Sequence, residues 1–133
     1  IIVLLILFLV AIHWVTIAIA LGADIDVQTF VCLAIAVLFV VVGNVLPRAR
    51  PNYTFGIRTP WTLADEDVWR RTHRVGGYVF WIMALVFAAA AFIPSMFGFL
   101  LAMGVTAVGV VFVLVYSYIL FDRKRKEGDI HDA

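Results

Sequence analysis

The feature that most constrains the fold is a set of four long windows that contain no Asp, Glu, Lys or Arg. Each has roughly the 20 apolar residues that an α-helix needs to cross the hydrocarbon core of a bilayer. Backbone groups find no water there, so each window is predicted to be a helix; barrel strands are excluded because neither face of any window is polar. The predicted spans are residues 1–21, 27–46, 75–93 and 96–121.

The composition leads to the same class. Hydrophobic residues make up 65% of the chain, against roughly 45–50% in soluble domains, and the mean hydropathy is +1.07. The single cysteine, Cys32, excludes an intramolecular disulfide and a cysteine metal cluster. The chain begins inside an apolar window without an initiator Met, which indicates a fragment that lacks an N-terminal segment. We therefore expect an integral membrane protein.

The charged residues predict the topology. All ten Lys and Arg fall in the 28-residue loop 47–74 or in the charged tail 122–133, whereas the turn after the first span carries Asp24 and Asp26. The positive-inside rule then places the loop and the C-terminus in the cytoplasm. The sequence predicts an all-α, antiparallel four-helix transmembrane domain over residues 1–121, and it leaves the oligomeric state open.

Within the loop, a short amphipathic helix is predicted from about Leu63. Thr62 and Asp65 have the spacing of a capping box at its N-terminus. Trp69 is expected to point toward the membrane surface or the helix ends. The helix is expected to lie on the inner leaflet and to turn at residues 76–77, both glycine, into the third span.

The charges of this helix have a structural explanation. Glu66–Arg70 and Asp67–Arg71 are i,i+4 pairs in the favourable order, and each is worth about 0.2–0.5 kcal/mol. They are expected to stabilise a solvated helix face.

Four other arginines have no acidic partner at helical spacing, namely Arg48, Arg50, Arg58 and Arg74. One interpretation is charge attracted to anionic lipid, at about 1 kcal/mol per residue. The other concerns Arg58, which precedes Thr59, Pro60, Trp61 and Thr62. A guanidinium, two hydroxyls and an indole on one turn could clamp a carboxylate, a phosphate or a helix end.

Three further polar residues have open roles. Asn44 is expected to bond carbonyls near the end of the second span, or the turn of residues 58–62. His13 lies inside the first span, where a hydrogen bond to a neighbouring helix competes with a proton relay. His73 has a proton-linked role as one alternative. Amphipathic rings expected to anchor the chain at the headgroup level are Trp81, Tyr116 and Tyr118.

Asn44 and the runs 55–63 and 66–74 resemble the loop of the SdpI-like family of bacterial multi-spanning membrane proteins. The resemblance implies a cytoplasmic-membrane protein without known catalysis, two further N-terminal spans in many members, and protection against a secreted membrane-active peptide toxin. It also implies a cytoplasmic repressor held at the membrane.

The leading hypothesis is therefore a non-enzymatic immunity and signalling protein, with the bilayer, a peptide toxin and a cytoplasmic repressor as partners. The alternatives are a small transporter or anionic-lipid-binding protein, and an accessory subunit of a membrane complex. No catalytic residue, cofactor, metal site or direct nucleic-acid contact is predicted. The candidate partner-binding or structural residues are Asn44, Arg58, Thr59, Pro60, Trp61, Thr62, Trp69, Arg70, His73 and Arg74.

Overall fold

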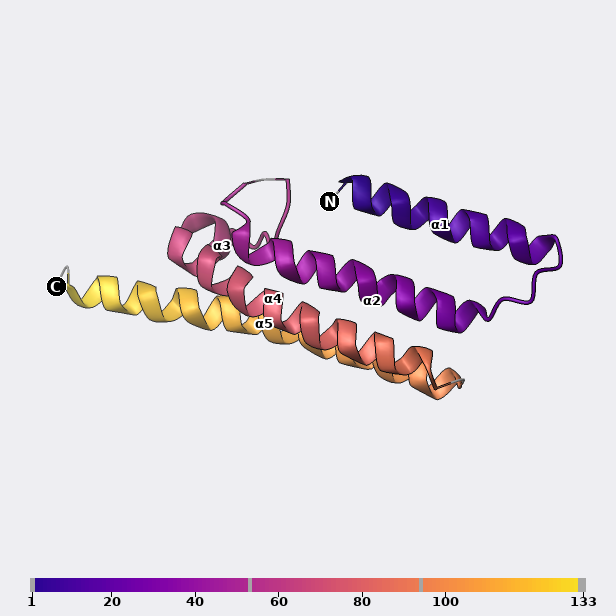
Figure 1. The fold of residues 1–133 in the computed structure, drawn as a ribbon. Coiled ribbons are helices and arrows are strands. Elements are labelled where there is room, and N and C mark those ends of the chain that lie inside the picture. The colour runs from indigo at the N-terminus through magenta and orange to yellow at the C-terminus, as the bar shows by residue number, and fades with distance from the viewer. Residues whose placement is uncertain (1, 53, 94, 132–133) are drawn as a thin grey trace.

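The computed structural model describes residues 2–52, 54–93 and 95–131, and within them the chain is helical without β-strands (Figure 1). The all-α prediction is confirmed. The elements in chain order are α1 (Ile2–Ala20), α2 (Val27–Val45), the 3-10 helix η1 (Leu46–Arg48), α3 (Pro60–Ala64), α4 (Glu66–Ala91) and α5 (Met96–His131). Four helices, α1, α2, α4 and α5, are long and apolar enough to cross a membrane. The chain is a multi-pass membrane protein.

The long helices run side by side and alternate in direction (Figure 1). The segment between α2 and α4 and the C-terminal end of α5 lie at one end of the bundle, which we call the loop end. α1 lies beside α2 at the edge, and none of its described residues is buried. The tightly packed part of the molecule is therefore α2, α4 and α5.

Small and aromatic side chains fill the core between these three helices. Phe39 of α2 meets Phe80 and Phe87 of α4 edge-on, with ring centroids 5.3 and 5.6 Å apart. Edge-to-face pairs of this kind add to the dispersion energy that drives helix packing in lipid. The buried core cluster consists of Cys32, Ala36, Phe87, Ala90, Ala91 and Ala102.

Two glycines bring α2 and α4 into backbone contact near the loop end. A Cβ on Gly77 would lie 2.6 Å from the Pro47 ring and 2.9 Å from the Gly43 carbonyl oxygen. A Cβ on Gly43 would lie 3.0 Å from the Gly77 carbonyl oxygen. Small residues allow this approach, which larger side chains would prevent.

The expected turn at residues 76–77 is wrong, because α4 is one helix from Glu66 to Ala91. Both glycines are buried inside it, and a Cβ on Gly76 would meet the side chains of Ile57 and Leu46 at 2.8 and 2.9 Å. These glycines make room for the loop without breaking the helix. α5 likewise continues to His131, so the expected tail is helical over its described part, with Asp122 paired to Arg125 and Lys126.

The opposite end of the bundle is closed by polar side chains at the start of α2. The Gln28 amide donates to the carbonyl oxygens of Ile93 and Ser95, at 2.9 and 3.2 Å. The Thr29 hydroxyl lies 2.9 Å from the Ala91 carbonyl oxygen. Ala91 is the last residue of α4, whose carbonyl the helix end leaves without a helical partner, and Ile93 and Ser95 lie in the turn that follows.

Candidate functional site

Trp69 and His73 form the buried centre of the loop end. Their side chains are 1% and 0% exposed, and their rings stack at 4.0 Å with 20° between the planes. The Trp69 indole N–H donates to the Ala49 carbonyl oxygen at 2.8 Å. Trp69 therefore does not point to the membrane surface, the first of its two expected directions. Its ring packs at the ends of the helices, the second expected direction, where the loop covers it and Ala49 at the end of η1 accepts its indole N–H.

Hydrogen bonds fix the protonation state of His73. Its Nδ1 lies 2.8 Å from the Trp69 carbonyl oxygen, and its Nε2 lies 2.9 Å from the Ile57 backbone nitrogen. A carbonyl only accepts and an amide N–H only donates, so Nδ1 donates and Nε2 accepts. This is the neutral ring with the proton on Nδ1. Both nitrogens are occupied, and His73 acts here as a structural clamp between α4 and the loop.

Gly56 makes this arrangement sterically feasible. Its φ is +122°, in the left-handed region that favours glycine. A Cβ at this position would lie 2.4 Å from His73 Nε2 and 3.0 Å from the Trp69 ring. Gly56 therefore supplies both the backbone conformation and the space.

The threonines of the loop form a capping box. Thr59 is the N-cap of α3, its Oγ1 accepts from the Thr62 N–H at 3.3 Å, and the Thr59 N–H donates to Thr62 Oγ1 at 3.0 Å. The Thr62 hydroxyl also donates to the Ile57 carbonyl oxygen at 2.7 Å. The predicted cap at Thr62 is thus wrong by three residues, because Pro60 occupies the first turn of α3, where its missing N–H does no harm.

Trp61 connects α3 to α5. Its indole N–H donates to the Ser117 hydroxyl at 2.8 Å, and its ring meets Tyr118 edge-on at 5.4 Å. Of the expected clamp residues, the hydroxyls and the indole therefore bond within the chain. The side chain of Arg58 is exposed on the surface of this turn.

Asp65 joins the start of α4 to the end of α5. Its carboxylate caps α4 by accepting from the N–H groups of Asp67 and Val68, and Lys124 Nζ lies 2.9 Å from Oδ2. Desolvation raises the pKa of Asp65, but the Val68 N–H, Lys124 and the Asp67 N–H outweigh it, so the pKa lies below its usual 3.8. Asp65 is thus the N-cap of the long helix, a role that the sequence assigned to Thr62.

The arginines of α4 differ in their pairing. Arg70 and Arg71 both bind Asp67, at 2.6 and 2.9 Å. The expected Asp67–Arg71 pair is confirmed, whereas Arg70 pairs at i−3 with Asp67 instead of with Glu66. Arg74 is exposed and has no ion pair among the described residues.

Other polar residues make few contacts. Asn44 is exposed and makes no side-chain hydrogen bond within the part of the chain that the structure describes, contrary to expectation. His13 is exposed on α1 and, within the same part, bonds to no neighbouring helix.

Thr72 Oγ1 is buried and has no partner among the described residues. No group of three potential metal ligands occurs in the described ranges.

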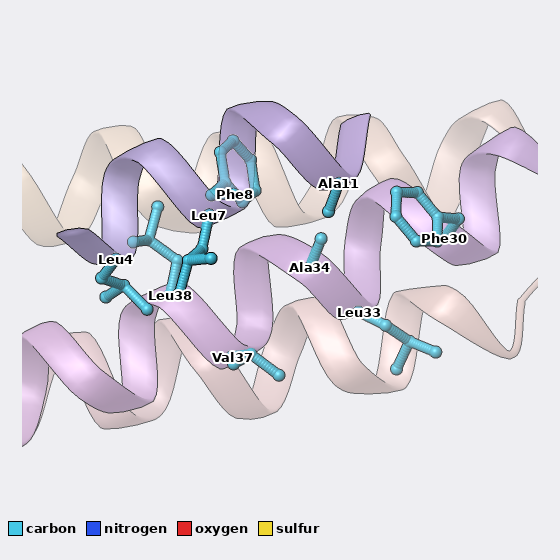
Figure 2. A pocket seen from close by; sticks show the side chains of 9 residues that line it. All are labelled: Leu4, Leu7, Phe8, Ala11, Phe30, Leu33, Ala34, Val37 and Leu38. Atoms are coloured by element: carbon cyan, nitrogen blue, oxygen red, sulfur yellow. The ribbon is translucent and has the colours of Figure 1, made fainter. Parts of the chain in front are cut away.

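An open apolar groove lies between α1 and α2. Its volume is about 430 Å³. Figure 2 shows Ala11 of α1 and Ala34 of α2 pointing toward each other across it, with Leu7 beside Leu38. The side chains at its centre are small and leave the space between the two helices unfilled, and the groove is open rather than enclosed. Its other lining residues are Leu4, Phe8, Phe30, Leu33 and Val37.

Sequence reasoning missed Gly56, Ser117 and Lys124 as parts of the site. Ser117 is a small hydroxyl residue in the apolar helix α5, and its place there was a usable signal. Lys124 and Asp65 are 59 residues apart, and nothing local pairs them.

The fold and its loop define a class: a helical multi-pass membrane protein whose long polar loop is packed against the ends of its spans. Residues 48–117 match the model of the SdpI/YfhL protein family, and the chain belongs to this family. The matched range ends at Ser117, the acceptor of the Trp61 indole. The resemblance seen in the loop motifs is confirmed.

One relative is Immunity protein SdpI of Bacillus subtilis (strain 168), which is 27% identical over 103 residues. The match covers 77% of this chain and 50% of the relative, so the chain spans about half the length of that protein. No solved structure matches the chain.

Proposed function

We propose that this chain acts in a non-enzymatic membrane immunity protein that protects a bacterial cell from a membrane-active peptide toxin. The observation that carries the proposal is the similarity to Immunity protein SdpI, together with membership of its family. The protein would reside in the cytoplasmic membrane with its loop and C-terminus inside, as the distribution of Lys and Arg predicts.

The groove between α1 and α2 supports a contact with such a toxin. Its lining is apolar throughout, and it opens to the side, where a membrane-inserted peptide would arrive (Figure 2). In lipid, helix association depends on close packing rather than on the hydrophobic effect, and Ala11 and Ala34 leave space for an incoming side chain. The toxin would fill this space and be held away from other toxin molecules.

The loop end is the proposed surface for a cytoplasmic repressor. The buried side chains Trp69 and His73 and the bonded Trp61 give it a fixed shape, and Arg58 is exposed on it. A guanidinium on a rigid turn is suited to a carboxylate of a partner protein.

The test is survival of a toxin-sensitive bacterium that expresses the full-length protein under challenge with membrane-active peptide toxins. Wild type should protect. Ala34→Phe fills the groove and should lower the tolerated toxin concentration about tenfold, equivalent to about 1.4 kcal/mol of lost binding. The matched control is Ala107→Phe, the same change at an exposed position of α5.

The outcomes separate the hypotheses. Absence of protection by wild type at verified membrane expression contradicts immunity and leaves lipid handling or an accessory role. Full protection by Ala34→Phe contradicts the groove as the toxin site while immunity stands. Equal losses in Ala34→Phe and Ala107→Phe indicate a general packing defect and also contradict the groove.

A further inference from the structure

A second hollow lies between α2 and α4 at the loop end. Its volume is about 330 Å³, and it lies where Gly43 and Gly77 bring the two helices into backbone contact. The polar and aromatic side chains that line it are Asn44, Arg48, Arg74, Tyr78 and Trp81. It is separate from the groove between α1 and α2, with which it shares no lining residue.

The two arginines give this hollow an uncompensated positive charge. Arg48 and Arg74 are exposed, and neither has an ion pair among the described residues. Arg74 also borders a neighbouring hollow, which is lined by Asp67. The Asp67 carboxylate, however, is bound by Arg70 and Arg71. Two guanidinium groups without acidic partners therefore border one hollow that also offers an amide and a phenol as donors.

The aromatic residues of the hollow are of the types that favour a membrane interface. Tyr78 and Trp81 are 67% and 40% exposed, and they lie just inside the apolar part of α4, where amphipathic rings favour the headgroup region. Ile82 and Leu85 follow them at helical spacing and are also exposed. The polar hollow thus continues into an apolar stripe along α4.

We infer that this hollow binds the phosphate headgroup of an anionic phospholipid. Arg48 and Arg74 hold the phosphate oxygens through charge-assisted hydrogen bonds, and guanidinium groups fit phosphate in a bidentate manner. Asn44 and Tyr78 donate to the remaining headgroup oxygens. The acyl chains lie along Trp81, Ile82 and Leu85, which gives a lipid an advantage over a free phosphate of the same charge.

The chemistry of the phosphate alone does not distinguish a lipid from a soluble phosphate, so the experiment includes both. The full-length protein is placed in nanodiscs of phosphatidylcholine that contain a minor fraction of phosphatidylglycerol. Bound phosphatidylglycerol is then measured by native mass spectrometry after detergent release. Free glycerol 3-phosphate and inorganic phosphate are added as competitors in separate samples.

The site variant is Arg48→Gln/Arg74→Gln, and the control is Arg70→Gln/Arg71→Gln. Both remove two positive charges at the loop end, so a general attraction to anionic lipid falls equally in both. In the control variant the Asp67 carboxylate loses both arginines but retains a cationic neighbour, because Lys124 Nζ lies 3.5 Å from its Oδ2. We expect phosphatidylglycerol binding about tenfold weaker in the site variant than in the control. Arg48→Lys/Arg74→Lys should recover part of the binding, because Lys keeps the charge and loses the bidentate geometry.

Equal losses in the two double variants would overturn the inference, since they would show attraction by charge alone. Displacement of the lipid by millimolar glycerol 3-phosphate or inorganic phosphate would overturn the assignment to a lipid. Unchanged binding in the site variant would exclude the hollow. A site variant that elutes as a monodisperse peak and melts like the control shows that its loss of lipid is not a loss of fold.

Discussion

At the scale of single residues, the fixed position of His73 depends on a residue with no side chain. Gly56 takes a φ of +122° and leaves the space that the His73 ring occupies beneath the loop. The neutral ring then joins the Ile57 N–H to the Trp69 carbonyl. A buried group with both nitrogens bonded contributes stability only while both partners stay in place, because an orphaned buried donor or acceptor is costly.

Gly56→Ala is therefore expected to destabilise the protein in two ways. The added methyl strains a left-handed backbone, which costs about 1–3 kcal/mol, and it overlaps His73 Nε2, which costs about 1–3 kcal/mol more. Gly22→Ala is the matched control, because Gly22 also has a positive φ, +95°, but has nothing within 4 Å of a Cβ. Thermal unfolding in detergent should show a clearly larger loss for Gly56→Ala. Equal losses would mean that backbone strain alone matters.

Single residues also mark the limit of what the sequence could predict. The pattern around Arg58 drew attention to the loop, and the partner-binding role of Arg58 stays a prediction. The burial of Trp69 could not be predicted, because it depends on a loop that closes over the ring through Ala49 and Gly56. The partner of Trp61 is 56 residues away, and helical spacing contains no information about such a contact.

At the scale of elements, α4 and α5 are joined where one begins and the other ends. Asp65 is the cap of α4 and the partner of Lys124 on α5, so one carboxylate stabilises a helix start and a helix pair together. The N-terminal dipole of α4 favours the same negative charge. α4 also continues without a break through residues 76–77. Glycine pairs usually suggest a break, but here packing against Ile57 and Leu46 outweighs their low helix propensity.

This joint is expected to weaken in acid. The pKa of Asp65 is lower in the folded state than its ordinary value of 3.8, so the stability that it contributes is fully present above about that pH. It is lost as the pH falls through the lower folded value. Asp65→Asn keeps a good cap residue but cannot ionise, and it should cost about 1 kcal/mol or less at neutral pH.

The measurement is the melting temperature of wild type and Asp65→Asn in detergent between pH 7 and pH 3. The difference in melting temperature between wild type and Asp65→Asn should shrink below about pH 4, because protonated Asp65 no longer attracts Lys124. Asp24→Asn, in an exposed turn, controls for loss of one negative charge. A difference that stays constant over this range would show that the Lys124 contact adds nothing to stability.

At the scale of the whole molecule, the number of spans and the charge distribution determine the expected orientation together. Four long apolar helices place the loop and the end of α5 at one end of the bundle, and all Lys and Arg residues lie in or next to these segments. The spans were predictable because length and apolarity are properties of each window alone. The loose packing of α1 was not, since its hydropathy is as high as that of the helices in the core.

Orientation is testable with single cysteines in a Cys32→Ala background, because the one native cysteine is buried between helices. Asp24→Cys should react with a membrane-impermeant maleimide on intact cells, since the positive-inside rule places this acidic turn outside. Thr54→Cys and Glu127→Cys, both exposed at the loop end, should react only after permeabilisation. Labelling of Thr54→Cys on intact cells would show that the orientation is the reverse of the expected one. It would also move the arginine hollow to the outer leaflet and the loop away from any cytoplasmic repressor, so the proposed signalling role depends directly on this result.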